Sequence, residues 1–74
     1  MALNRAFPVP SSVVRITGSS PTSFAEAARA AVAQLGPQDI RTAYYFDVVS
    51  EDGTISGDKV QEFQVTLDIW YHIR

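Results

Sequence analysis

The fold is decided by the stretch Val60-Gln61-Glu62-Phe63-Gln64-Val65-Thr66-Leu67-Asp68-Ile69-Trp70-Tyr71-His72-Ile73-Arg74. From Phe63 to Ile73 every second side chain is apolar, and this period of two predicts a strand rather than a helix. A pleated strand places these apolar residues on one face and the intervening residues on the other. The second face would carry acids, an amide, an indole and an imidazole: Glu62, Gln64, Thr66, Asp68, Trp70 and His72. We therefore expect the function to involve this second face.

The length of 74 residues predicts one domain, near the lower size at which a single hydrophobic core is stable. The chain has no cysteine, so neither disulfides nor thiolate metal sites can stabilise it. A hydrophobic content of 46% favours stabilisation by association of copies. Pro8 and Pro10 predict that residues 1–11 form an extended N-terminal tail, whereas residues 12–74 form the folded domain.

Charge and hydropathy argue against two classes of partner. The net charge is −2, and the six basic residues are spread singly, which is unlike a nucleic-acid-binding protein. No apolar run approaches the roughly 18 residues of a membrane span, and the N-terminus lacks the apolar segment of a secretory signal. We expect a cytoplasmic protein that binds neither nucleic acid nor membrane.

The segment before the last strand has its own alternation. Ile40–Ser50 is predicted to be a strand, with a turn at Glu51-Asp52-Gly53 and a second irregular point at Gly57-Asp58. Strict alternation would put one set of side chains on each face. The two sets are Ile40, Thr42, Tyr44, Phe46 and Val48, and Arg41, Ala43, Tyr45, Asp47 and Val49.

A helix is predicted upstream of these strands. Either Ser20 or Ser23 could cap it, and Ser23 with Glu26 has the spacing of a capping box. Gly36-Pro37 is expected to end it. The amphipathic stripe consists of Phe24, Ala27, Ala28, Ala31, Val32 and Leu35. Because this stripe is mostly alanine, the helix can lie very close to the sheet that it covers.

The first strand is predicted over Ser12–Thr17, with Gly18 ending it. The resulting order β-α-β-β predicts an α+β fold in which a three-stranded antiparallel sheet is partly wrapped around one helix. One helix covers only one face of a sheet. We expect neighbouring subunits to share the other face, with Val13, Tyr45, Val49 and Trp70 as candidates for it.

No residue pattern typical of an enzyme is present, so we expect no catalytic activity. His72 is the only side chain that ordinarily titrates near neutral pH, and no serine or threonine stands in a recognisable nucleophile motif. Gly18-Ser19-Ser20 is either a phosphate-binding turn or ordinary helix capping. The acidic residues Asp47, Glu51, Asp52 and Asp58 form either a cation site or a solvated hairpin tip.

Aromatic residues are the more informative signal. Tyr45 and Trp70 offer flat faces, and Gln64 offers a hydrogen-bond donor and an acceptor side by side. A planar heterocycle with an imide edge would bind such a surface by stacking and paired hydrogen bonds. The alternative is that these residues only pack in an interface between subunits.

Two motifs of the chain resemble those of a known family. Val13-Val14-Arg15-Ile16-Thr17-Gly18-Ser19-Ser20-Pro21 is similar to the first strand and following turn of the dodecins, and Phe63-Gln64-Val65-Thr66-Leu67 is similar to their last strand. The resemblance covers residues 12–74. It implies a small flavin-binding protein that assembles as a hollow shell of twelve identical subunits. In that reading the partners are other copies of the chain and a small aromatic ligand, either FMN or riboflavin, which the shell stores or sequesters.

The resemblance also implies roles for individual residues. Gln64 matches the glutamine that hydrogen-bonds the flavin pyrimidine edge, and Tyr45 falls where the family has a stacking tryptophan, or Tyr44 if the register slips by one. Trp70 would either fill the pocket or supply the stacking surface. His72 falls where some members place a basic residue near a flavin phosphate. The alternative is a shell without flavin that binds a cation or another ligand such as coenzyme A, or that is purely structural.

Overall fold

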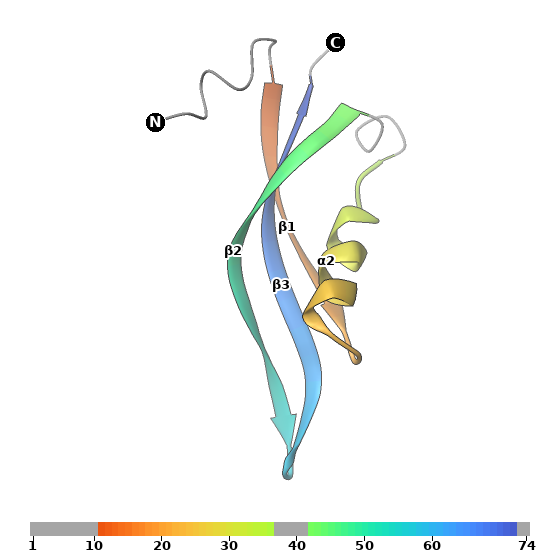
Figure 1. Cartoon of the computed structure of the whole chain (residues 1–74), viewed down its shortest axis with the longest axis vertical. Coiled ribbons are helices and arrows are strands. Elements are labelled where there is room, and N and C mark those ends of the chain that lie inside the picture. Colours follow the sequence, from red (N-terminus) through yellow and green to blue (C-terminus); the bar gives the residue numbers. More distant parts are fainter. Residues whose placement is uncertain (1–10, 37–41, 73–74) are drawn as a thin grey trace.

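The computed structural model describes residues 11–36 and 42–72. Its elements are β1 (Ser11–Ser20), α2 (Phe24–Val32), β2 (Ala43–Ser56) and β3 (Lys59–His72). The three strands form one antiparallel sheet in the order β1-β3-β2, and α2 lies against one face of it (Figure 1). The predicted α+β fold and β-α-β-β order are confirmed. The predicted tail lies outside the described residues except for Ser11, which is the first residue of β1.

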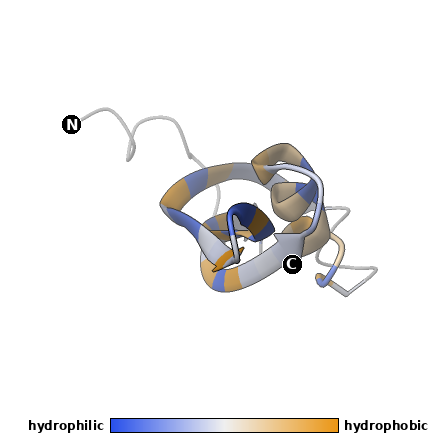
Figure 2. Ribbon diagram, turned by 90° about the horizontal axis from the view of Figure 1, so that it is seen from below, coloured by the Kyte–Doolittle hydropathy of each residue, from blue (hydrophilic) through white to orange (hydrophobic). Residues whose placement is uncertain are grey.

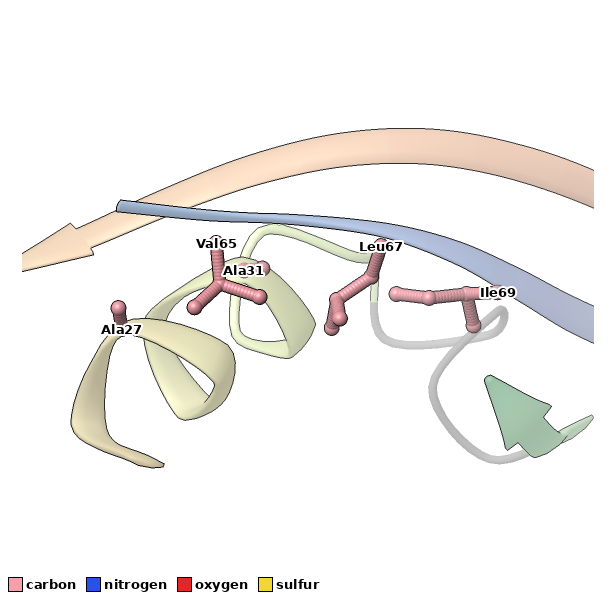
Figure 3. Packing of buried hydrophobic residues seen from close by; sticks show 5 residues of the cluster. All are labelled: Ala27, Ala31, Val65, Leu67 and Ile69. Atoms are coloured by element: carbon pink, nitrogen blue, oxygen red, sulfur yellow. The ribbon is translucent and has the colours of Figure 1, made fainter. Parts of the chain in front are cut away.

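The C-terminal stretch forms β3, which is the central strand of the sheet. It pairs with β1 from Ser11 opposite His72 to Ser20 opposite Phe63, and with β2 along its other edge. Its apolar residues Val65, Leu67 and Ile69 are at most 2% exposed and lie on the sheet face that α2 covers (Figure 3). Hydrophobic and hydrophilic residues alternate along the strands (Figure 2), which is the pattern expected when only one face of a sheet is covered.

The helix α2 begins where the capping box predicts. Ser23 is the N-cap, and its Oγ accepts a 3.1 Å hydrogen bond from the backbone N–H of Glu26. Ser20 is not the cap, because its Oγ accepts from the N–H of Thr22 instead. The helix ends at Val32, earlier than predicted, because the N–H of Leu35 bonds to the carbonyl of Val32 and tightens the chain into a turn.

Close approach of α2 to the sheet depends on small residues. Ala27 and Ala31 are fully buried against β3 (Figure 3). A Cβ atom on Gly18 of β1 would lie 2.8 Å from Ala31 Cα and closer still to the carbonyl oxygen of Ala27. Gly18 therefore does not end the first strand as predicted. Its role is to let the helix backbone touch the sheet, while β1 continues to Ser20.

The predicted turn at Glu51-Asp52-Gly53 is wrong, because β2 continues through it to Ser56. A Cβ on Gly53 would lie 3.2 Å from the carbonyl carbon of Glu62, so this glycine marks a close backbone approach within the hairpin. The turn is made by Gly57, at φ 66°, and Asp58. The hairpin consequently extends well beyond the helix at the lower end of Figure 1.

Bulges in β2 change the predicted faces of that strand. Register shifts occur between Ala43 and Tyr45 and between Val48 and Ser50. Ala43 pairs with Tyr71 and packs against the core, whereas strict alternation would place it with Tyr45 on the opposite face. Ile40 and Arg41, the predicted start of this strand, lie outside the described residues.

The helix packs on β1 and β3 and leaves β2 largely uncovered. Phe46 and Val48 face the helix side of the sheet but are 49% and 48% exposed. Between α2 and β2 lies an apolar groove of about 500 Å³. Its lining consists of Ala25, Ala28, Arg29, Val32, Ala33, Phe46 and Leu67. Within the described ranges, no helix has the length and hydropathy needed to cross a membrane.

Candidate ligand-binding site

The sheet face opposite α2, here called the open face, carries the polar side of β3. Antiparallel partners project to the same side of a sheet, so the strand register shows which side chains share this face. Its rows across β1, β3 and β2 are Val13, Trp70 and Tyr45; Arg15, Asp68 and Asp47; Thr17, Thr66 and Ser50; and Ser19, Gln64 and Asp52.

Four aromatic or imidazole rings gather at one end of the open face. The ring centroids of Tyr45 and Trp70 are 5.5 Å apart with an interplanar angle of 61°, an edge-to-face contact. Tyr44 stacks on His72 with centroids 4.2 Å apart and planes inclined by 11°. Tyr44 reaches this cluster because it is the extra residue of the bulge between Ala43 and Tyr45. Three predicted site residues, Tyr45, Trp70 and His72, therefore lie together.

Gln64 shares the open face but lies far from these rings. It pairs with Ser19 of β1 and Asp52 of β2, six residues along β3 from Trp70. At the rise of an extended strand this separation is about 20 Å. A single chain therefore does not bring the predicted amide and the predicted stacking residues to the same ligand.

The row next to the aromatic cluster is charged. Asp47 of β2 and Asp68 of β3 are direct cross-strand partners. Repulsion between two carboxylates in this position destabilises the sheet unless other groups bind them. Arg15 donates two hydrogen bonds to Asp68, of 2.8 Å and 3.0 Å, and this bonding and the guanidinium charge lower the pKa of Asp68. The Tyr45 hydroxyl donates a 3.0 Å bond to Asp47, which raises the pKa of Tyr45. Each carboxylate is thus bound by a separate donor.

These contacts on the open face were not predicted from the sequence. Arg15 and Asp68 are 53 positions apart, so their pairing is visible only once the register of β1 on β3 is known. The hydroxyls of Thr17 and Thr66, separated by 2.8 Å, meet for the same reason. In the sequence, only the alternation of these four residues with buried apolar residues could have indicated that they share a face of the sheet.

Two other predicted possibilities do not match the structure. Gly18-Ser19-Ser20 belongs to β1 and pairs with β3, so its backbone does not form a phosphate-binding turn. The acidic residues do not form a loop: Asp47 and Asp52 lie on the open face, whereas Glu51 pairs with Val65 on the helix side. Among residues 11–36 and 42–72, no three carboxylate or imidazole groups cluster in a way that could hold a metal ion.

Comparison with known proteins gives one match. No curated protein is significantly similar in sequence to the chain. The sequence model of the Dodecin family, in contrast, matches residues 12–74, which include all of α2, β2 and β3 and nearly all of β1. This span covers most of the chain and contains the β-α-β-β order described above. The chain therefore belongs to the Dodecin family.

Proposed function

We propose that the protein is a non-enzymatic binding protein that sequesters a flavin-type ligand between subunits of a homo-oligomer. The observation that carries the proposal is the direct cross-strand pairing of Tyr45 and Trp70 on the sheet face that α2 leaves uncovered. Family membership supports the association of identical chains. A planar ring system bound at this position would be shielded from water on both sides by a second copy.

The ring geometry refines how the aromatic pair would act. Because the planes of Tyr45 and Trp70 are inclined by 61°, the two rings cannot both lie flat against the same ligand. One ring stacks on the ligand, and the other supports it edge-on. Trp70, one strand away from the position of the family tryptophan, can therefore supply the larger stacking surface while Tyr45 holds it in place through its contact.

A second copy is needed to complete the site. Gln64 lies about 20 Å along β3 from Trp70, farther than a three-ring heterocycle can reach. If two open faces oppose each other with their strands running in opposite directions, Gln64 of each copy comes close to the rings of the other. Its amide donor and acceptor then match the alternating acceptor and donor groups of an imide edge. Such an arrangement has two equivalent sites.

His72 contributes through its contact with Tyr44. The stacked pair, with centroids 4.2 Å apart, borders Tyr45 along β2 and fixes the end of the aromatic cluster. The role of His72 near the polar tail of a flavin stays a prediction.

Quenching of flavin fluorescence tests the proposal. Titration of riboflavin with micromolar protein should quench its emission, since stacked aromatic rings quench an excited flavin. We expect Trp70→Ala to weaken binding about tenfold or more, as loss of a base-stacking aromatic does, and Gln64→Ala to weaken it about three- to tenfold. The matched control is Glu51→Gln, on the helix side of the same sheet.

Light scattering on the same samples separates the possible outcomes. Quenching by an oligomer that requires more protein in both site variants and is unchanged in the control supports the proposal. An oligomer that quenches neither riboflavin nor FMN contradicts flavin binding and favours a shell without flavin.

A further inference from the structure

We propose that the open face selects a planar ligand without a phosphate group, so that the proposed site prefers riboflavin over FMN. This inference rests on the proposed function and concerns the ligand class of the same site. It follows from the charges that the strand register places around the aromatic cluster and around Gln64.

The described part of the open face is acidic. It carries four carboxylates, those of Asp47, Asp52, Glu62 and Asp68, and one guanidinium, that of Arg15. Arg15 is bound to Asp68 through both hydrogen bonds and is therefore already neutralised. None of the other three carboxylates forms an ion pair with another described residue. Lys59 stands at the hairpin end, next to Asp58.

These carboxylates lie where the ligand would bind. Asp52 is the direct cross-strand partner of Gln64, so their Cβ atoms are about 5 Å apart, and Glu62 is the next residue of β3 on the same face. At the other end, Asp68 is the next residue on that face after Trp70, and Asp47 lies opposite it. Carboxylates therefore flank both the amide and the rings.

Opposition of two copies brings the two acidic groups together. When Gln64 of one copy approaches the rings of the other, Asp52 and Glu62 accompany it, because they belong to the same end of the same face. They then face Asp47 and Asp68 across the ligand. A ligand tail that points along β3 away from His72 lies beside these carboxylates.

A phosphate placed beside Gln64 would meet the carboxylates of Asp52 and Glu62, whereas the one guanidinium on the described part of the open face, that of Arg15, is already paired with Asp68. A phosphate carries about −1.5 to −2 charges at neutral pH, and the carboxylates without an ion-pair partner, those of Asp47, Asp52 and Glu62, repel it. The amino-terminal end of α2, which would attract an anion, is on the opposite face of the sheet (Figure 1). A ribityl chain, in contrast, is uncharged and offers hydroxyl donors that carboxylates accept.

Parallel titrations with riboflavin and FMN test this selectivity. At low ionic strength we expect riboflavin to bind about tenfold more tightly than FMN, because several like charges at surface distances add up to this ratio. The ratio should decrease as the ionic strength rises from about 0.01 M to about 1 M, since salt screens the repulsion. Equal affinities, or tighter binding of FMN, would overturn the inference while leaving the proposed function intact.

Two neighbouring carboxylates on opposite faces give a matched pair of variants. Asp52→Asn should lower the riboflavin-to-FMN ratio about threefold by removing one repelling charge next to Gln64. Glu51→Gln removes the same charge from the helix side and should leave the ratio unchanged. An equal effect of the two substitutions would mean that net charge, and not the open face, sets the preference, which contradicts the inference. Binding of neither flavin would refute the proposed function and the selectivity with it.

Discussion

At the scale of single residues, the contact between helix and sheet depends on Gly18. The backbone of α2 passes so close to β1 that a Cβ atom at this position would overlap Ala27 and Ala31. Both alanines are fully buried, so the helix has no larger side chain that could yield. These small residues permit the close contact between α2 and β1, and for the same reason the contact leaves no space for a larger side chain.

The substitution Gly18→Ala should destabilise the protein by at least about 2 kcal/mol, because the new methyl group would overlap backbone atoms of Ala27 and Ala31 in α2. Urea unfolding followed by circular dichroism measures this change. Gly36→Ala is the control, because a Cβ there meets no atom within 4 Å and φ is not positive. We expect it to be neutral or slightly stabilising. Equal stability of Gly18→Ala and the unchanged protein would contradict the close approach.

At the scale of secondary-structure elements, α2 and β2 differ in what determines where each element begins and ends. The helix α2 is defined locally, by a serine cap and by a turn after Val32. The strand β2 is defined by its partner: it extends past an acidic Gly-containing segment because β3 continues to offer backbone hydrogen bonds. Its bulges then move Tyr44 and Ala43 to faces that alternation does not predict.

Removal of the cap should weaken α2 without changing the sheet contacts. We expect Ser23→Ala to lower the stability by about 1 kcal/mol, because the backbone N–H of Glu26 loses its acceptor. Thermal unfolding should show the loss as a decrease in Tm of about 4–8 °C. Thr22→Ala, at the exposed neighbouring position, provides the comparison and should change Tm little. A decrease of equal size in both variants would mean that the cap is not its cause.

At the scale of the whole molecule, one helix is too small for the sheet. It covers β1 and β3, whereas the helix side of β2 exposes half of Phe46 and half of Val48 beside an apolar groove. The described hydrophobic core consists of five fully buried residues: Ala27, Ala31, Val65, Leu67 and Ile69. A core of this size gives little stability to an isolated chain, and burial of β2 against other copies would supply more.

We expect light scattering to give a mass several times that of the 8.1 kDa chain, as an oligomer requires. The substitution Phe46→Asp should shift the protein to smaller species, because it places a charge on the exposed apolar side of β2. Thr22→Asp adds the same charge at an exposed polar position and should leave the mass unchanged. Retention of the full mass by Phe46→Asp would exclude this side of β2 from the interface.

The sequence by itself determined the features that depend on residues close together in the chain. The alternation from Phe63 to Ile69 specified a strand with one buried face, and Ser23 with Glu26 specified the start of the helix. The alanine stripe was readable for the same reason, whereas the hairpin turn was predicted at Glu51-Asp52-Gly53 and lies instead at Gly57-Asp58, which the sequence marked only as an irregular point. Such patterns act within a few positions, so no knowledge of the fold is needed to interpret them.

Only the tertiary structure decided what depends on register. It placed β3 at the centre of the sheet, gave Gly18 a packing role and brought Tyr44 onto His72. It also placed Gln64 about 20 Å along β3 from Trp70, so that one chain does not bring the proposed amide and the proposed rings to the same ligand. The physical reason is that a shift or bulge of one residue reverses every side chain beyond it, and local sequence carries no signal for that shift.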